Sequence, residues 1–402
     1  MRALARSLAI SVILAASTNS GIADEPAATT TTASAVSRAA ESAGLRVKNV
    51  EIDAPAAVHS NLSFKTSNYN DPRLVSLRKK YELEKVVAGA QDEWTAQRML
   101  RNWVHTRIPN GTPKVQVRHA EEILDAAAKG EAFWCTYYAI SMAECAQALG
   151  WQCRKIAIGR LHDPETKVAG NHHGITEIWS NQFGKWIAMD AHFDFHTEKN
   201  GLPLSAWEVR AEWLKDGGKS IDHIAGPPAT AAKKLRLRTN WDRPGEDESS
   251  TYFWVYYEDH AIAPDSPASQ RLIFPQDAAN AGRTWYQRSG EAGEPGLIEH
   301  IGYRRQKFLP TERLEDVYST VGVVEIRTAE AAADSGSIRL VLDSHCPNQT
   351  GYEVARDGGG WTPFDGNSAT WKPKSGANVL KLRTVSAGDV HGAVATLRME
   401  VE

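Results

Sequence analysis

The chain carries, in this order, Cys135, His173 and Asp190. Their side chains are of the types that serve as a nucleophile, a proton carrier and an orienting carboxylate. A cysteine thiolate attacks a carbonyl carbon, an imidazole moves the protons of the reaction, and a carboxylate holds the imidazole in one tautomer. This chemistry needs no cofactor and no metal. The three residues therefore predict a cysteine-dependent acyl-transfer enzyme, provided that the fold brings their side chains together.

The thiol is predicted to lie at the start of a helix. Apolar residues continue after Cys135 without a helix breaker until Gly150, a residue type that favours the end of a helix. We expect a helix that begins at about Cys135 and ends near Leu149. A thiol in the first turn of a helix lies beside unpaired N–H groups and a partial positive charge, which lower its pKa.

The imidazole and the carboxylate are predicted to lie on two strands of one hairpin. Residues 173–180 alternate in polarity, residues 185–190 form the next strand, and residues 181–184 suit a four-residue turn. If Ser180 pairs with Lys185, Asp190 lies diagonal to His173 on the same face, within reach of its side chain. His172 points to the other face of the strand, so we favour His173 as the base.

Three blocks of sequence resemble the transglutaminase-like superfamily, a relative of the papain-type folds. They span residues 130–135 with Tyr138-Ala139 and Leu149-Gly150, residues 173–177, and residues 184–190. The resemblance covers roughly residues 75–215. It implies a papain-like α+β core in which Cys135 is the nucleophile, His173 the general base and acid, and Asp190 the orienting carboxylate. Ala191, where the family often has Pro, and Gly174-Ile175 depart from the family pattern.

Several residues beside the three blocks are expected to contact a substrate. They are Trp134, Tyr138, His172 and His192. The substrate that the acyl-transfer hypothesis implies is a protein or a peptide, cleaved or cross-linked at an amide bond.

Two other kinds of site fit some of the same residues. Asp190, His192, Asp194 and His196 alternate, so an extended chain would place four potential metal ligands on one face. The chain also has 13 Trp, and aromatic clefts of exported proteins often hold sugars. A polysaccharide lyase or hydrolase, with Tyr137 or Tyr138 handling protons, is therefore the alternative function, and a non-catalytic binding protein is a further one.

The N-terminus predicts export to the periplasm or the medium. A basic start with Arg2 and Arg6, an apolar run over residues 8–16 and small residues before Asp24 are typical of a signal peptide. The apolar run is too short to span a bilayer, and no later stretch is long and apolar enough. A net charge of -3 without a dense Lys/Arg cluster argues against nucleic-acid binding.

Four cysteines are too few for a disulfide scaffold in 402 residues. Besides Cys135, the chain has Cys145, Cys153 and Cys346. Cys145 and Cys153 are close in sequence and could pair, or both could be buried free thiols.

The composition divides the chain into five parts. We expect a signal peptide over residues 1–23, a flexible segment over 24–73, a transglutaminase-like domain over 74–226, a β-rich intervening region over 227–320, and a β-sandwich over 321–402. The short apolar runs and glycine turns of the last part are typical of sandwich strands. The predicted fold class is therefore α+β, with a transglutaminase-like core and a C-terminal β-sandwich.

Overall fold

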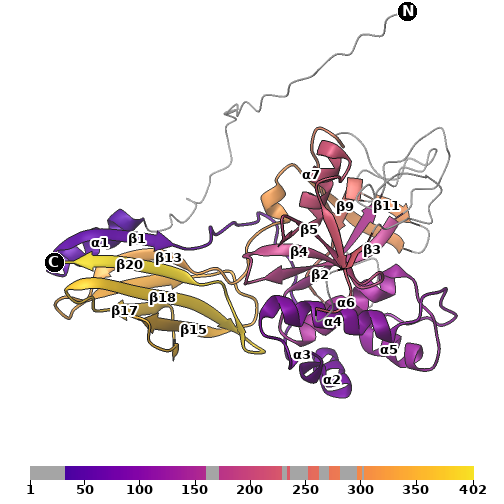
Figure 1. Ribbon diagram of the computed structural model, residues 1–402, viewed down its shortest axis with the longest axis horizontal. Helices are drawn as coiled ribbons and strands as arrows, with labels where there is room; N and C mark the ends of the chain where they lie inside the picture. Colours follow the sequence, from indigo (N-terminus) through magenta and orange to yellow (C-terminus); the bar gives the residue numbers. More distant parts are fainter. Residues whose placement is uncertain are drawn as a thin grey trace, which may run out of the picture.

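The computed structural model describes residues 32–159, 172–228, 233–235, 252–261, 271–280, 297–300 and 303–402. The expected signal peptide lies outside these ranges. The described chain forms a core of helices and one large sheet, and a second unit of two antiparallel sheets (Figure 1). This arrangement confirms the α+β class.

Five helices precede the sheet of the core. They are α2 (Pro72–Tyr81), α3 (Leu83–Val87), α4 (Glu93–Arg107), α5 (Ala120–Ala128) and α6 (Cys135–Ala148). The predicted helix over 135–149 is confirmed by α6, which ends where Gly150 takes a φ of +91°. Helices α2, α4 and α5 pack on α6, and α6 packs on β2 and β3 of the sheet. Helix α6 is therefore the centre of the helical layer.

The sheet of the core runs in the order β11-β12-β10-β9-β2-β3-β4-β5-β7-β8, with β6 beside β5. Its strands are β2 (Cys153–Gly159), β3 (His172–Ser180), β4 (Lys185–Asp190), β5 (Phe195–Lys199), β6 (Leu202–Pro203), β7 (Asp222–Ala225), β8 (Lys233–Leu235), β9 (Trp254–Tyr257), β10 (Arg271–Pro275), β11 (Leu297–His300) and β12 (Tyr303–Thr311). Ser180 pairs with Lys185, which confirms the predicted register of the hairpin. The described part of the region 227–320 continues this sheet.

Alternate residues of the central strands bury both faces of the sheet. Ile178, Ile187 and Met189 pack with the helical layer, whereas Ile175 and Ala188 pack with α7 (Ala206–Asp216) on the other side. The core is therefore a sheet between two layers, and this burial on both faces fixes the strand register.

The second unit consists of two sheets around one apolar cluster. One sheet has the order β1-β20-β18-β15-β16 with β19 beside β18, and the other has the order β13-β14-β17. Their strands are β1 (Val47–Asp53), β13 (Glu325–Ala331), β14 (Ile338–Asp343), β15 (Gln349–Arg356), β16 (Thr362–Phe364), β17 (Ser368–Trp371), β18 (Gly376–Ser386), β19 (Val390–His391) and β20 (Ala395–Val401). Leu340 and Trp371 of one sheet share the cluster with Leu382 and Leu397 of the other.

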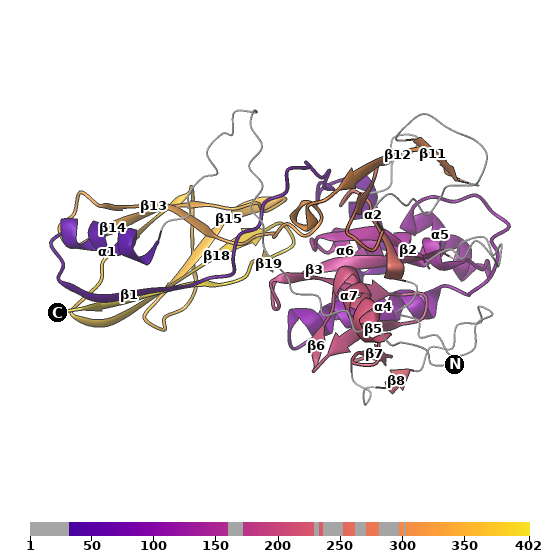
Figure 2. The same ribbon diagram turned by 90° about the horizontal axis from the view of Figure 1, so that it is seen from above.

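The expectation of a flexible segment over residues 24–73 is wrong for part of that range. Residues 33–42 form α1 (Ala33–Ser42), and β1 pairs antiparallel with β20. The Ala- and Ser-rich composition resembles a tether, but Val36, Ala39 and Ala40 make one apolar helix face that is buried in the cluster of the second unit. Both ends of the described chain therefore build the second unit, as Figure 2 shows from above.

Candidate active site

Cys135 is the first residue of α6 and lies against strand β3. The peptide N–H of Gly174 hydrogen-bonds the thiol. A Cβ atom on Gly174 would lie 3.2 Å from the Cα of Thr136 and 3.4 Å from its nitrogen. A glycine at this position therefore lets the strand approach the first turn of the helix closely enough to contact the sulfur.

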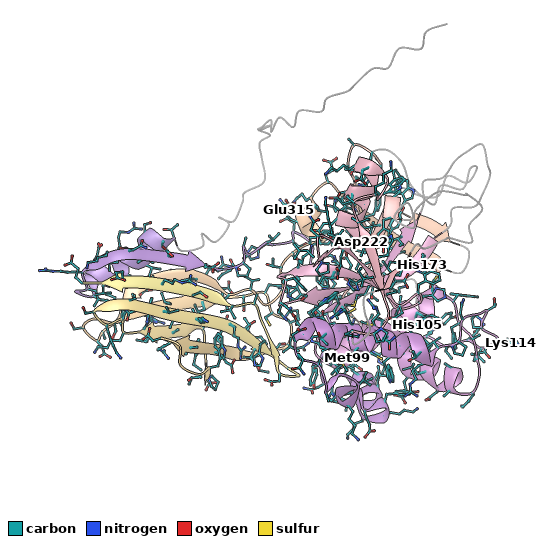
Figure 3. The ribbon with its side chains drawn as sticks, viewed as in Figure 1. Met99, His105, Lys114, His173, Asp222 and Glu315 are labelled. Atoms are coloured by element: carbon teal, nitrogen blue, oxygen red, sulfur yellow. The ribbon has the colours of Figure 1, made fainter. Side chains whose placement is uncertain are left out.

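His173 connects the thiol to Asp190. Its Nε2 lies 2.6 Å from Oδ2 of Asp190, and a hydrogen bond joins its ring to the thiol of Cys135. Because Asp190 occupies Nε2, Nδ1 is the nitrogen that remains for the sulfur. The other oxygen of Asp190 accepts the peptide N–H groups of His192 at 2.8 Å and Phe193 at 3.0 Å. The three predicted residues thus form one hydrogen-bonded chain. Figure 3 shows the position of His173 in the core.

The charges of this chain favour a thiolate beside an imidazolium. Burial opposes ionisation of Cys135, but the hydrogen bond and charge of His173 and the N–H of Gly174 outweigh it and lower the pKa of the thiol. Burial also opposes a charged His173, yet the charge and hydrogen bond of Asp190, together with Cys135, raise the pKa of the imidazole well above its ordinary value. Against its own burial, Asp190 has a lowered pKa because His173 is its partner.

The other three cysteines have raised pKa values, in contrast to Cys135. All four cysteines are free thiols in this structure. Burial raises the pKa of Cys145 and Cys153 well above the ordinary value and that of Cys346 to about 11. Cys135 is therefore the one cysteine of the chain whose surroundings favour the reactive, ionised form.

Two exposed aromatic side chains flank the thiol and the imidazole. Trp134 directly precedes Cys135 and is 44% exposed. Phe193 is 39% exposed, and its ring lies 5.2 Å from the ring of His173. Trp134 was among the residues expected to contact a substrate, whereas Phe193 was not, although its place three residues after Asp190 was a usable signal.

Tyr138, which was expected to contact a substrate, is buried beneath the site. It is 2% exposed, and its hydroxyl donates a hydrogen bond to the carbonyl of Ile108. Burial and the charge of Asp190 raise its pKa to about 12. The expectation that Tyr138 contacts a substrate is therefore wrong, because a buried hydroxyl that is already bonded packs beneath the site. The side chain of His172 lies outside the described part of the structure.

His192 lies beside the triad and bonds a residue that the sequence did not single out. Its Nε2 is 2.9 Å from Oδ1 of Asn110, and its ring lies 5.7 Å from that of His173 and 4.7 Å from that of Tyr138. Asn110 follows Pro109 in a segment that reads only as a helix-ending turn. No sequence pattern therefore indicated that Asn110 reaches the site.

The four alternating residues of the metal alternative do not share one face. Strand β4 ends at Asp190, residues 191–194 turn, and Asp194 has a φ of +54°. The side chain of Asp194 accepts Nε of Arg101 at 2.8 Å, and Nδ1 of His196 lies 2.8 Å from Nη1 of the same arginine. The turn therefore directs Asp194 and His196 to Arg101.

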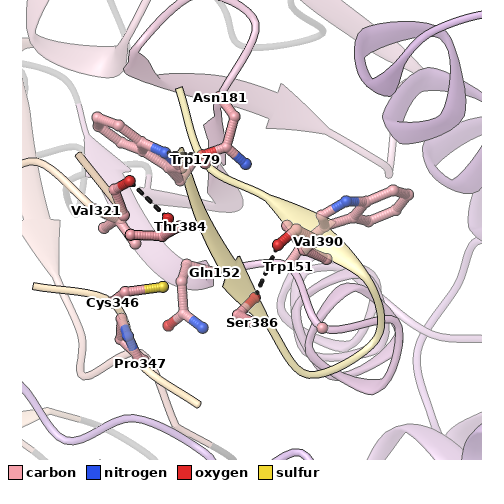
Figure 4. Close-up of a pocket in the computed structure, with 13 residues that line it drawn as sticks. Trp151, Gln152, Trp179, Asn181, Val321, Cys346, Pro347, Thr384, Ser386 and Val390 are labelled. Atoms are coloured by element: carbon pink, nitrogen blue, oxygen red, sulfur yellow. Dashed lines mark hydrogen bonds between the residues drawn. The ribbon is translucent and has the colours of Figure 1, made fainter. Parts of the chain in front are cut away.

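A pocket between the core and the second unit has none of the three triad residues in its lining (Figure 4). Its wall includes Trp151 and Trp179 of the core, and Cys346, Thr384 and Val390 of the second unit. The hydroxyl of Thr384 donates to the carbonyl of Gly322 at 2.7 Å. This pocket therefore belongs to the junction of the two units.

Residues 82–191 match the family model described as Transglutaminase-like superfamily, a range that contains the whole Cys–His–Asp chain. One matching solved structure is titled "The Crystal Structure of a Putative Cysteine Protease from Cytophaga hutchinsonii to 1.9A". It is 11% identical in sequence with a TM-score of 0.25, and the match covers 50% of this chain and 68% of that chain. No curated protein matches the chain. Among the described residues, no helix has the length and apolar character to cross a membrane.

Proposed function

We propose that this chain, whose residues 82–191 belong to the transglutaminase-like superfamily, is an exported cysteine-dependent acyl-transfer enzyme that acts on amide or peptide bonds. The observation that supports this function best is the hydrogen-bonded order Cys135, His173, Asp190 at the start of α6. It supplies a nucleophile, a proton carrier and an orienting carboxylate in contact with one another.

The first half of the proposed reaction forms a thioester. The thiolate of Cys135 forms a bond to the carbonyl carbon, and the π electrons of the carbonyl move to its oxygen. The unpaired N–H of Cys135 in the first turn of α6 stabilises that oxyanion. The electron pair then returns, the C–N bond breaks, and the imidazolium of His173 gives its proton to the leaving amine.

The second half releases the acyl group. The neutral imidazole of His173 takes a proton from water or from an acceptor amine as its oxygen or nitrogen attacks the thioester carbon. The C–S bond breaks and returns the thiolate. Asp190 keeps Nε2 of His173 hydrogen-bonded through both halves, so that Nδ1 stays directed to the sulfur.

The geometry favours amide substrates over polysaccharides. A glycosidic bond has no carbonyl that a thiolate could convert to a thioester. The alternative mechanism would instead use Tyr137 or Tyr138 to move protons. Of these two, Tyr138 is bonded to Ile108 and its pKa is raised to about 12. We therefore propose peptides and amides, rather than polysaccharides, as the substrates.

Alkylation and substitution of Cys135 test this function. Limiting iodoacetamide followed by peptide mass spectrometry is expected to label Cys135 before Cys145, Cys153 and Cys346. Cys135→Ala is expected to abolish hydrolysis of casein and of 4-nitrophenyl acetate, whereas the matched variant Cys346→Ala keeps both activities. Slow labelling of Cys135, or new reducing ends from a polyuronate that the Cys135→Ala variant still produces, would contradict the proposal.

A further inference from the structure

Asn110 lies where the chain before the nucleophile helix meets the turn after Asp190. The peptide N–H of Phe133 donates to Pro109 at 2.8 Å, and that of Gly111 donates to Phe133 at 3.1 Å. Residues 109–111 thus run parallel to the chain at Phe133, two residues before Cys135. The backbone of Asn110 is therefore fixed beside the start of α6.

The side chain of Asn110 extends from this position to the turn that follows Asp190. Its Oδ1 lies 2.9 Å from Nε2 of His192. The ring of His192 is packed against Phe193, at 4.3 Å between centroids, and lies beside His173. The amide of Asn110 therefore bridges the segment that carries the nucleophile and the turn that follows the carboxylate.

The protonation of His192 decides which atoms of this amide remain available. Burial lowers the pKa of His192 to about 4, so the ring is neutral near pH 7 and carries one N–H. Its Nδ1 is buried without a partner, whereas Nε2 contacts Oδ1 of Asn110. We therefore assign the hydrogen to Nε2, which donates to Oδ1. Both hydrogens of Nδ2 of Asn110 then remain, on an exposed side chain, and no residue in the described ranges accepts them.

A thioester-forming site needs donors for the oxygen that becomes negative in the transition state. The N–H of Cys135 is one such donor, because it stands at the first position of α6 and Trp134 gives the helix no side-chain cap. One donor leaves the developing charge partly unsatisfied. A second donor must come from a group beside the start of α6 that has a free N–H.

We propose that the side-chain amide of Asn110 is the second donor of the oxyanion hole, with the N–H of Cys135 as the first. This inference rests on the proposed acyl-transfer function and makes Asn110 a catalytic residue. As the C–S bond forms, the carbonyl π electrons move to the oxygen, which accepts Nδ2–H of Asn110. Asn110 gives up no proton. When the pair returns and the C–N bond breaks, the hydrogen bond weakens again. His192 is a positioning residue that holds Oδ1.

Asn110→Asp separates a donor role from a structural one. An aspartate has nearly the same shape and still accepts Nε2–H of His192, but it has no N–H to give. With 4-nitrophenyl acetate as the probe, we expect kcat of Asn110→Asp and of Asn110→Ala to fall roughly 100- to 1000-fold, with little change in KM. We expect His192→Ala to lower kcat less than either, because it frees the amide without removing it.

Two controls keep this test independent of folding and of the proposed function. The iodoacetamide rate of Cys135 in Asn110→Ala should equal that of the wild type, since alkylation forms no oxyanion. Thr112→Ala, an exposed change in the same segment, should leave kcat unchanged. If Cys135→Ala keeps its activity, the proposed function is wrong. If Cys135→Ala is inactive while Asn110→Asp and Asn110→Ala stay within threefold of wild type, only the role of Asn110 is wrong.

Discussion

At the scale of single residues, one proton is shared between the thiol of Cys135 and the imidazole of His173. Asp190, buried and held by two peptide N–H groups, stabilises the imidazolium. The N–H of Gly174 stabilises the thiolate. Because the pKa of the Cys135 thiol is lowered and the pKa of the His173 imidazole is raised well above its ordinary value, the ion pair persists above the pH at which an ordinary imidazole loses its proton.

We expect two different pH profiles from this ion pair. Alkylation of Cys135 rises as the thiol loses its proton, so its midpoint should lie below the pKa near 8.5 of an ordinary thiol, and the rate should stay high at alkaline pH. The kcat/KM should rise over the same pH range in which the alkylation rate rises. It should then fall as His173 loses the proton that it must give to the leaving amine, above the ordinary imidazole pKa. Iodoacetamide rates and kcat/KM against pH measure the two profiles.

Cys346 is the internal reference for these profiles. Burial raises its pKa to about 11, so its alkylation should rise only in strongly alkaline solution. If Cys135 and Cys346 share one midpoint, the lowered pKa of Cys135 is wrong.

At the scale of elements, helix α4 holds the turn that follows strand β4. Both oxygens of Asp194 are bonded to this helix, Oδ1 to Nε of Arg101 at 2.8 Å and Oδ2 to Nδ2 of Asn102 at 2.7 Å. Arg101 and Asp194 are buried, and Asp194 has a left-handed φ of +54° that an unsupported aspartate rarely adopts. The same turn supplies the two N–H groups that bond Asp190. Arg101 therefore supports Asp190 through this turn, and its charge also interacts with Asp190 directly.

We expect Arg101→Gln to destabilise the protein by about 3–5 kcal/mol, because it leaves the carboxylate of Asp194 buried and unpaired. The double variant Arg101→Gln with Asp194→Asn removes both charges and should recover part of the loss. Denaturant unfolding of the two single variants and the double variant gives the coupling energy, expected at about 0.5–3 kcal/mol. Strictly additive losses would show that Arg101 and Asp194 do not stabilise the turn together.

Local patterns predicted the elements that carry the triad, because each signal lies within a few residues. The four-residue turn between Ser180 and Lys185 fixes the pairing, and the pairing places Asp190 beside His173. Gly150 ends helix α6 as expected.

What the sequence did not indicate depends on contacts between distant segments. Asn110 reaches His192 across 82 positions of the chain, and Arg101 reaches Asp194 across 93. The strict alternation from Asp190 to His196 suggested one extended face, but the buried arginine stabilises a turn there instead. A single sequence carries no local signal for such long-range pairs.

At the scale of the whole molecule, the two units meet where helix α6 ends. The tip of the loop between β18 and β19 packs against this end. A Cβ on Gly150 would lie 2.4 Å from the carbonyl oxygen of Ala387, and one on Gly388 would lie 2.8 Å from that of Leu149. Each unit therefore contributes glycines that permit close backbone contact. Cys135 is at the N-terminal end of the same helix. The second unit therefore contacts the C-terminal end of the helix whose N-terminal end carries Cys135.

The second unit also depends on the N-terminal part of the chain. Strand β1 covers the outer edge of β20, and the apolar face of α1 packs into the shared cluster. An uncovered β20 would present unpaired N–H and C=O groups to other molecules.

A protein that begins at residue 54 is therefore expected to unfold at a lower temperature than one that begins at residue 24, and to self-associate. It loses the burial of Val36, worth about 1.5–3 kcal/mol, and the partial burial of Val50 and Ile52, each worth less than that. Thermal unfolding measures the first effect, and size-exclusion chromatography at several concentrations measures the second. Thr32→Ala in the longer protein is the mild control, because it removes only the cap of α1, at a cost of about 1 kcal/mol. A shorter protein that stays monomeric and unfolds at the temperature of the longer one would mean that the remaining strands close the second unit without α1 and β1.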